Sequence, residues 1–558
     1  MTRRLIRALA AAVIGAVIFS GCAEIPKSSP VRQGPDIQNG LASEYLYYSP
    51  SGPVAGESKA DVLTGFLNAS TGPQNDFAVA REYLAPNFRT QWSPNDQVYI
   101  QRGGQQVNFG NSGRASVSIG VSATVDGQGH YSSRPSGTNQ VLQFKLAKVK
   151  GEWRITEAPN AVVMIRPVFE VIFHSYAVYY FDHSYNYLVP DLRWFPARAS
   201  TATRLVSAIL SGPSKWLAGA IAPAMPTGTK LAIESVTVDE KTAVVNLSAQ
   251  ALQASSLQKQ RFKAELTATL TQLTGVSKVE IRIANAQQKI DDFSPASTSS
   301  GAYAPVVLAS KQLQQLVGPS GSRLANANQW VSSLGVTDFA VTTDQTSVAL
   351  VTKAGIYTGR LDQPGHDPVL VDHRTNILPP KFDRRGQLWM LGVDGSLQIL
   401  PSAGKGAWFK LSWLKDHTVK AFAISAEGSR VAMLVADSKG RIRLEVAAII
   451  RNRMGIVTGF GSPIELGYGV GKPVAIEWAG KTSLLVLADI DGNQSNLSML
   501  TVGGDPRAIG TLDHAFGLMS SDDGSNIFVL DSQKRVLQYH GYTWTLLDQD
   551  VTAAHMVN

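Results

Sequence analysis

Short apolar strands recur at a regular spacing in the C-terminal part of the chain. Apolar anchors lie at successive intervals of 41, 42, 54 and 41 residues, at Val341, Phe382, Ile424, Trp478 and Met519. After each anchor comes a polar stretch, usually with Asp or Gly, and then a second apolar strand. A period of about 40–45 residues with about four strands per unit is the signature of a β-propeller. The pattern therefore predicts a propeller over residues 304–558.

The two ends of this repeat array complement each other. Residues 551–556 look like the first strand of a unit with nothing after it. Residues 305–310 and 312–318 look like later strands that lack a first strand before them. Joining the two ends makes a blade closed by strands from both, which protects the sheet edges. The array favours six blades, with five or seven as alternatives, and the longer interval predicts extra residues near 451–471.

Upstream of the repeats, the pattern predicts an α+β domain over residues 44–168. Apolar residues fall on one helical face behind Ser58, a favourable capping residue, at Val62, Leu63, Phe66 and Leu67. A second short helix is predicted over 77–84. Apolar and polar residues then alternate in three predicted strands, at 117–125, 142–146 and 153–155. Two helices packed on an antiparallel sheet give an α+β arrangement.

Residues 169–290 show a second order of elements, β-α-β-β-α-β. Strands are predicted at 176–181, 186–195, 230–239, 242–247 and 279–283, and helices at 201–210 and 256–274. A glycine follows each helix, as is common at helix ends. Residues 291–303 begin with a stretch rich in Ser, Thr, Pro and acid, which predicts a linker.

The N-terminus predicts export and lipidation. Three arginines precede an apolar run over residues 8–19, and the run ends in a Phe-Ser-Gly-Cys sequence. A basic segment and a short apolar run are typical of a signal peptide, here 1–21, and small residues before Cys22 look like a bacterial lipobox. An ordinary signal peptide cut elsewhere is the alternative. Acylated Cys22 would hold the protein on the extracytoplasmic face of the cell membrane, with 22–43 as a flexible tether.

Composition narrows the function classes. The chain has 558 residues, is 44% hydrophobic and 17% charged, and has one cysteine, so it can form neither an internal disulfide nor a thiolate zinc cage. The net charge is +8. Residues 186–290 hold 12 Lys or Arg against 6 Asp or Glu. This excess indicates either docking to an anionic polymer or an ordinary solvated face, and the scattered positions favour the second.

A search for catalytic motifs yields no candidate site. The sequence has no His-Glu-x-x-His and no Gly-x-Ser-x-Gly motif. The glycine-rich run 467–472 lacks the spacing of a phosphate loop, and 489–493 reads as an Asp-Gly hairpin turn rather than a calcium site. Four tryptophans are expected to pack inside blades, namely Trp330, Trp389, Trp408 and Trp478. We expect no enzyme activity, no catalytic residue, no metal, no cofactor and no nucleic-acid partner.

The order of domains resembles a known family. Residues 151–155 are similar to the last hairpin of NTF2-like domains, and 197–213 with 226–248 are similar to the GerMN domain of spore-germination and cell-wall-associated proteins. With the lipobox and the propeller, this order resembles the LpqB lipoprotein family over essentially the full chain, as do the local runs 66–69 and 80–84. The expected fold is multidomain: two α+β domains, NTF2-like and then GerMN, followed by an all-β propeller.

The resemblance also implies a function. Members of this family are expected to bind the extracytoplasmic domain of a two-component sensor histidine kinase and to modulate cell-envelope metabolism and division. An envelope scaffold that binds anionic wall polymer through the basic residues of 186–290 is the first alternative. A propeller hydrolase is the second, and it would need convergent carboxylates or a metal in the propeller channel.

Overall fold

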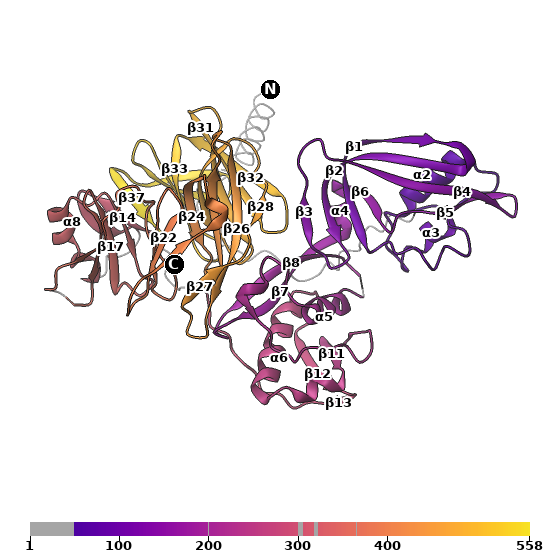
Figure 1. Ribbon diagram of the computed structural model, residues 1–558, viewed down its shortest axis with the longest axis horizontal. Coiled ribbons are helices and arrows are strands. Elements are labelled where there is room, and N and C mark those ends of the chain that lie inside the picture. The colour runs from indigo at the N-terminus through magenta and orange to yellow at the C-terminus, as the bar shows by residue number, and fades with distance from the viewer. Residues whose placement is uncertain (1–49, 199, 299–304, 317–321, 364, 558) are drawn as a thin grey trace, which may run out of the picture. The chain divides into compact units, whose positions relative to one another are not determined.

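The computed structural model describes residues 50–198, 200–298, 305–316, 322–363 and 365–557 (Figure 1). Residues 50–558 form one unit, in which three groups of elements follow one another along the chain. The expected signal peptide 1–21, Cys22 and the tether 22–43 lie outside the described residues.

The first group packs two helices on a sheet. Its elements are α2 (Lys59–Ala69), α3 (Ala78–Glu82), β1 (Gln97–Phe109), the 3-10 turn η1 (Asn111–Gly113), β2 (Arg114–Asp126), β3 (Tyr131–Ser133), β4 (Asn139–Val149), β5 (Glu152–Glu157) and β6 (Val162–Ile165). The strand order is β5-β4-β2-β1-β6, with β3 also on β2. Ser58 and Asp61 form a capping box at α2, so the expected helix start is confirmed. Strand β1 was not expected. Its second half is exposed and rich in Gln, so apolar and polar residues do not alternate along it.

Aromatic side chains fill the space between α2 and this sheet. The Phe66 ring centroid lies 5.1 Å from that of Trp92 and 6.1 Å from that of Phe144. Phe77 meets Trp92 edge-on. All four are buried, and each contributes on the order of 2 kcal/mol of hydrophobic stabilisation. The space between α2 and the sheet is therefore filled by side chains.

The second group holds two small sheets and two main helices. Its elements are α4 (Arg166–Ile172), β7 (Phe173–Asp182), β8 (Leu188–Pro196), α5 (Thr201–Ser211), η2 (Ala218–Ala220), β9 (Ile221–Ala222), β10 (Thr237–Asp239), β11 (Thr242–Leu247), η3 (Ala249–Gln253), α6 (Ser256–Leu270), β12 (Lys278–Ile283) and β13 (Ala286–Gln287). The sheet orders are β8-β7-β9 and β10-β11-β12-β13. Strands β11 and β12 run parallel, and α6 forms the crossover between them.

Two expected elements of this group are shorter than predicted. The strand expected over 230–239 is regular only at β10, because a tight turn from Ser235 N to Ile233 O breaks the run and Val236 N donates to Thr203 Oγ1 of α5. The helix expected to reach 274 ends at Leu270. Its start is fixed by a capping box of Ser255 and Gln258.

Polar side chains of α6 and of the turn after it cover one edge of β7. The strand's backbone N–H groups donate to them in three places, from Phe181 to Glu265 Oε1 (3.0 Å), from Tyr179 to Thr269 Oγ1 (3.1 Å) and from Ala177 to Gln272 Oε1 (2.9 Å). Glu265 and Thr269 are four residues apart and so lie on one face of α6, and Gln272 follows in the turn after the helix. The helix thus supplies the hydrogen bonds that a further strand would make.

The described residues of the third group form six sheets around one axis, so the expected six-bladed propeller is confirmed. Blades 1 and 2 are β16 (Asp338–Val341), β17 (Ser347–Thr352), β18 (Gly355–Arg360) and β19 (Val369–Asp372), then β20 (Lys381–Phe382), β21 (Leu388–Leu391), β22 (Ser396–Leu400) and β23 (Ala407–Lys410). Blade 3 is β24 (Thr418–Ile424), β25 (Arg430–Ala436), β26 (Ile442–Arg451), β27 (Val457–Phe460) and β28 (Ile464–Leu466). Blades 4 and 5 are β29 (Lys472–Trp478), β30 (Ser483–Asp489), β31 (Gln494–Thr501) and β32 (Pro506–Asp513), then β33 (Ala515–Ser520), β34 (Ile527–Asp531), β35 (Val536–His540) and β36 (Thr543–Asp548).

Blade 6 joins the two ends of the array as expected. It consists of β37 (Val551–His555), β14 (Val306–Ala309) and β15 (Gln312–Gln315), with β37 antiparallel to β14. The short helices α7 (Ser322–Ala325) and α8 (Asn328–Leu334) follow β15, and the 3-10 turn η4 (Ser412–Leu414) follows β23. The extra residues expected near 451–471 form the short strands β27 and β28. Both pair with the long strand β26, β28 with its first half and β27 with its second.

Candidate functional site

Acidic side chains near the propeller's inner strands are paired with basic side chains. His555 Nε2 lies 2.5 Å from Asp338 Oδ1, and Lys381 Nζ lies 2.6 Å from Glu477 Oε2. Arg384 of blade 2 pairs with Asp522 of blade 5 and also donates to Thr298 O. Burial raises the pKa of Asp522 to about 6, against the opposing effect of Arg384. Each of these acids therefore has a basic partner within the protein.

A buried ion pair joins the second group to the propeller. Arg385 Nη2 donates to Asp182 Oδ2 at 2.7 Å, and the Asp182 side chain is 2% exposed. Asp182 also accepts from the Ser184 hydroxyl at 2.6 Å and so organises its own turn. The Arg385 guanidinium lies over the Tyr187 ring. The sequence predicted that Asp182 lies in a turn between two strands. It did not predict the pair with Arg385, which is 203 positions away.

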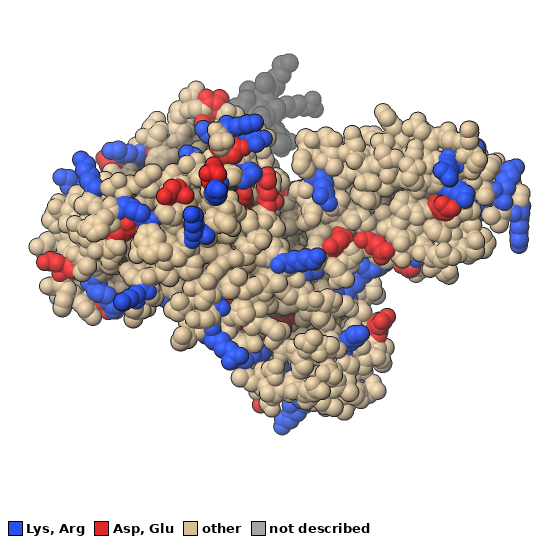
Figure 2. Space-filling model, viewed as in Figure 1, with Lys and Arg blue, Asp and Glu red and all other residues tan. Residues whose placement is uncertain are grey.

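The basic side chains of 186–290 are in part used inside the protein. Arg193 is buried and pairs with Asp191 at 2.7 Å, and Arg261 stacks on Tyr185 at 3.8 Å. Burial lowers the pKa of Arg204 to about 10. Figure 2 shows Lys and Arg scattered over the visible face and mixed with acids, without a dense basic patch. The buried arginines add nothing to a basic surface, and on the visible face the remaining cations are mixed with acids.

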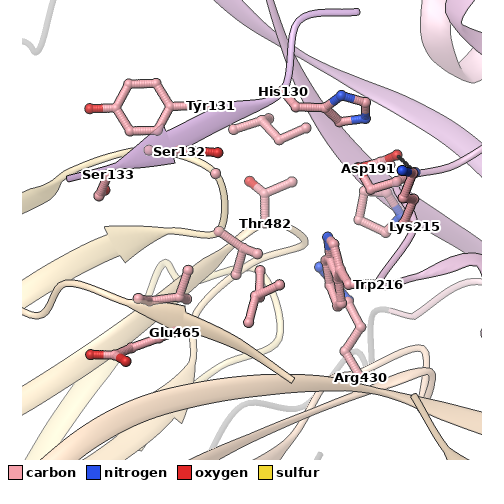
Figure 3. A pocket seen from close by; sticks show the side chains of 18 of the residues that line it. His130, Tyr131, Ser132, Ser133, Asp191, Lys215, Trp216, Arg430, Glu465 and Thr482 are labelled. Atoms are coloured by element: carbon pink, nitrogen blue, oxygen red, sulfur yellow. Dashed lines mark hydrogen bonds between the residues drawn. The ribbon is translucent and has the colours of Figure 1, made fainter. Parts of the chain in front are cut away.

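A cavity of about 580 Å³ lies where the three groups of elements meet (Figure 3). Its wall includes the β2–β3 hairpin, residues 190–192 of β8, the segment after α5 and parts of blades 3 and 4. His130 Nδ1 lies 2.8 Å from Asp126 Oδ2, while His130 Nε2 is buried without a hydrogen-bond partner. Burial pushes the pKa of Asp126 upward, but the hydrogen bonds from His130 outweigh it and hold that pKa below its usual value.

The Asp-Gly turn and the four tryptophans also have defined places in the structure. Asp489 and Asp491 accept backbone N–H groups within the β30–β31 turn, as a hairpin turn requires. Trp330, Trp389 and Trp478 are buried as expected. Trp408 is not: it is 60% exposed, because it lies on the outermost strand of blade 2, and Arg374 stacks on it. Among the described residues, no group of three or more His, Cys, Asp or Glu side chains could hold a metal ion.

Family models match three segments of the chain. The model for the N-terminal domain of lipoprotein LpqB matches residues 52–170, a sporulation and spore germination model matches 177–289, and the lipoprotein LpqB β-propeller model matches 314–555. None of the described helices combines the length and the apolar character that a bilayer crossing requires.

Individual relatives cover most of the chain. A lipoprotein LpqB of Cutibacterium acnes is 26% identical over 504 residues, 87% of this chain and 82% of its own. A lipoprotein LpqB of Streptomyces avermitilis is 25% identical over 547 residues, 90% of this chain and 89% of its own. Among solved structures, the first GerMN domain of the sporulation protein GerM from Bacillus subtilis is 25% identical with a TM-score of 0.19, over 22% of this chain and 94% of that one.

Proposed function

This chain belongs to the lipoprotein LpqB family, and on that premise we propose that it is a membrane-anchored signalling accessory. Acylated Cys22 would hold it on the extracytoplasmic face, where it binds the extracytoplasmic domain of a two-component sensor kinase. Binding would modulate the kinase that controls envelope metabolism and division. In this proposal the protein binds and positions a partner and catalyses no reaction.

The observation that carries the proposal is a pair of large apolar side chains that the propeller exposes. Tyr542 is 97% exposed and Met454 is 82% exposed. Each lies in the turn between the third and fourth strands of its blade, in blades 5 and 3. In an antiparallel blade this turn lies on the same face as the turn between the first two strands, which carries Arg385. Exposed aromatic and Met side chains are enriched at protein interfaces.

Direct binding of the full chain, in detergent, to the purified sensor domain of the cognate kinase tests the proposal. We expect saturable binding that weakens about tenfold or more in Tyr542→Ser or Met454→Ser, since interface anchors typically contribute about 2 kcal/mol. Val470→Ser is the matched control, because Val470 is 71% exposed but lies between blades 3 and 4 on the opposite face.

The wall-polymer scaffold predicts a different result. Binding to isolated anionic wall polymer would fall steeply with salt, and it would weaken on neutralising lysines of 186–290 rather than on removing Tyr542. Absence of kinase binding at high micromolar concentration, together with salt-sensitive polymer binding, would replace the signalling proposal with the scaffold.

A further inference from the structure

The cavity between the three groups of elements has unused hydrogen-bonding groups in its wall. Among its charged lining residues, Asp126, Asp191 and Arg430 are already paired within the protein. Lys215 and Glu465 have no charged partner among the described residues, and Figure 3 shows them on opposite sides of the cavity. In Figure 3 the Glu465 carboxylate points away from the labelled ring side chains, so Lys215 is the charged group that a ligand would meet.

Two ring nitrogens add to this set. The Trp216 indole N–H, a donor only, has no acceptor among the described residues. Asp126 pairs with His130 Nδ1, and His130 Nε2 is buried with no hydrogen-bond partner. That nitrogen accepts a hydrogen bond when the ring is neutral and donates one when it is protonated. A hydroxyl group suits it in both states, since a hydroxyl can donate and accept.

The rest of the wall combines apolar and hydroxyl-bearing side chains. Apolar surface comes from Pro190, Leu192, Ile464, Leu466 and Val502, and hydroxyls come from Ser132, Ser133 and Thr482. A purely apolar ligand would leave the hydroxyls and ring nitrogens unsatisfied, which costs about 1–3 kcal/mol for each buried group. A volume of about 580 Å³ lies within the range of small-molecule sites, about 300–1,000 Å³.

We propose that this cavity is a binding site for a small saccharide that carries a carboxylate. The carboxylate would pair with Lys215 and accept from the Trp216 N–H. The sugar hydroxyls would bond His130 Nε2 and the serine and threonine hydroxyls, while the C–H faces of the ring would lie on the apolar wall. Because the wall draws on all three groups of elements, an occupant would also hold them together. The site does not depend on a kinase partner.

Titration calorimetry on the full chain in detergent, with glucuronic acid and N-acetylmuramic acid as probes, tests the site. Glucose and N-acetylglucosamine are the matched probes without a carboxylate. We expect dissociation constants of about 1 mM for the acids and at least tenfold weaker binding of the neutral sugars, equivalent to about 1.4 kcal/mol. Lys215→Met should remove this preference, and Lys439→Met, on an exposed turn of blade 3, should keep it.

A second measurement uses the unaltered protein. Lys215 is exposed, so it should be acetylated by a mild amine reagent, and either acid should slow that labelling several-fold while the neutral sugars do not. Labelling of Lys439 is the internal reference. Absence of heat with both acids at about 20 mM, or protection of Lys215 and Lys439 to the same degree, overturns the proposal.

Discussion

His555 Nε2 lies 2.5 Å from Asp338 Oδ1, and this pair ties the last strand of the chain to the first strand of blade 1. The His555 ring also meets Phe339 edge-on, with centroids 5.1 Å apart. Because His555 belongs to β37, the pair lies where the two ends of the propeller array meet. It connects the blade built from both ends to its neighbour.

Removing this pair should loosen the closure of the propeller. We expect Asp338→Asn to lower the free energy of unfolding by about 1 kcal/mol, since both side chains are 24% exposed and a partly solvated pair contributes modestly. Amide hydrogen exchange in β37 should rise more than elsewhere. Asp362→Asn, which breaks an exposed pair with Arg360, is the control. Equal exchange in β37 for the two variants would contradict a closing role.

A pH effect is expected from Glu265, which is buried in α6 with Phe181 N as a hydrogen-bond donor. Burial raises the pKa of Glu265 to about 8 from a usual value of 4.5, so the folded protein holds a proton that the unfolded chain releases. This carboxyl therefore costs no stability below about pH 4.5. Between about pH 4.5 and pH 8 the cost grows, and above that it levels off on the order of 5 kcal/mol.

Replacing Glu265 with Gln should flatten this dependence. Gln keeps an oxygen for Phe181 N and cannot ionise, so chemical denaturation from pH 5 to 9 should show a smaller loss of stability in Glu265→Gln than in the natural chain. Thr269→Val, which removes the neighbouring acceptor of Tyr179 N, should lower stability equally at every pH. Parallel pH profiles for the natural chain and Glu265→Gln would show that Glu265 is ionised in the folded protein.

The blade architecture was predictable because each blade repeats a local pattern. An apolar strand, a polar turn and a second apolar strand recur within about 15 residues, and a strand pair of this kind depends on near neighbours along the chain. The closing blade was predictable from the same repeat. The strands at 305–318 and 551–556 had no neighbouring strands to complete a unit, so they were expected to pair with each other. Strand β1 was missed for the opposite reason, since exposure of its second half removes the alternation.

The candidate sites depend on contacts between distant positions and could not be predicted in this way. Asp182 looks like an ordinary turn residue until Arg385 is seen beside it. The cavity combines His130, Lys215 and Glu465 from three groups of elements, and no spacing in the sequence relates them. Trp408 shows the same limit, because a tryptophan on an outermost strand reads like one inside a blade until its exposure is known.

Lipidation at Cys22 makes a direct prediction about location. Since the thiol of the sole cysteine is the expected site of acylation, Cys22→Ser should release the protein from the membrane fraction into the extracytoplasmic soluble fraction. Metabolic labelling with a palmitate analogue should mark the natural chain and not the variant. Retention of Cys22→Ser in membranes after a high-salt wash would show that something other than an acyl chain anchors the protein.

The Asp182–Arg385 pair should couple the unfolding of the second group to that of the propeller. Asp182→Asn leaves the Arg385 guanidinium, only 13% exposed, without its charge partner, and we expect a loss of about 2–3 kcal/mol. In calorimetry, one cooperative transition should separate into two. Arg385→Met should give the same split, and the double variant should be little less stable than either single variant, since neighbouring changes in one ion pair are not additive.

Arg441→Met is the control. It removes an exposed pair with Asp437, so it should leave the single transition intact. A single transition in Asp182→Asn at an unchanged midpoint would mean that other contacts, such as the Trp194 Nε1 to Gly503 O hydrogen bond of 2.7 Å, hold the parts together without this ion pair.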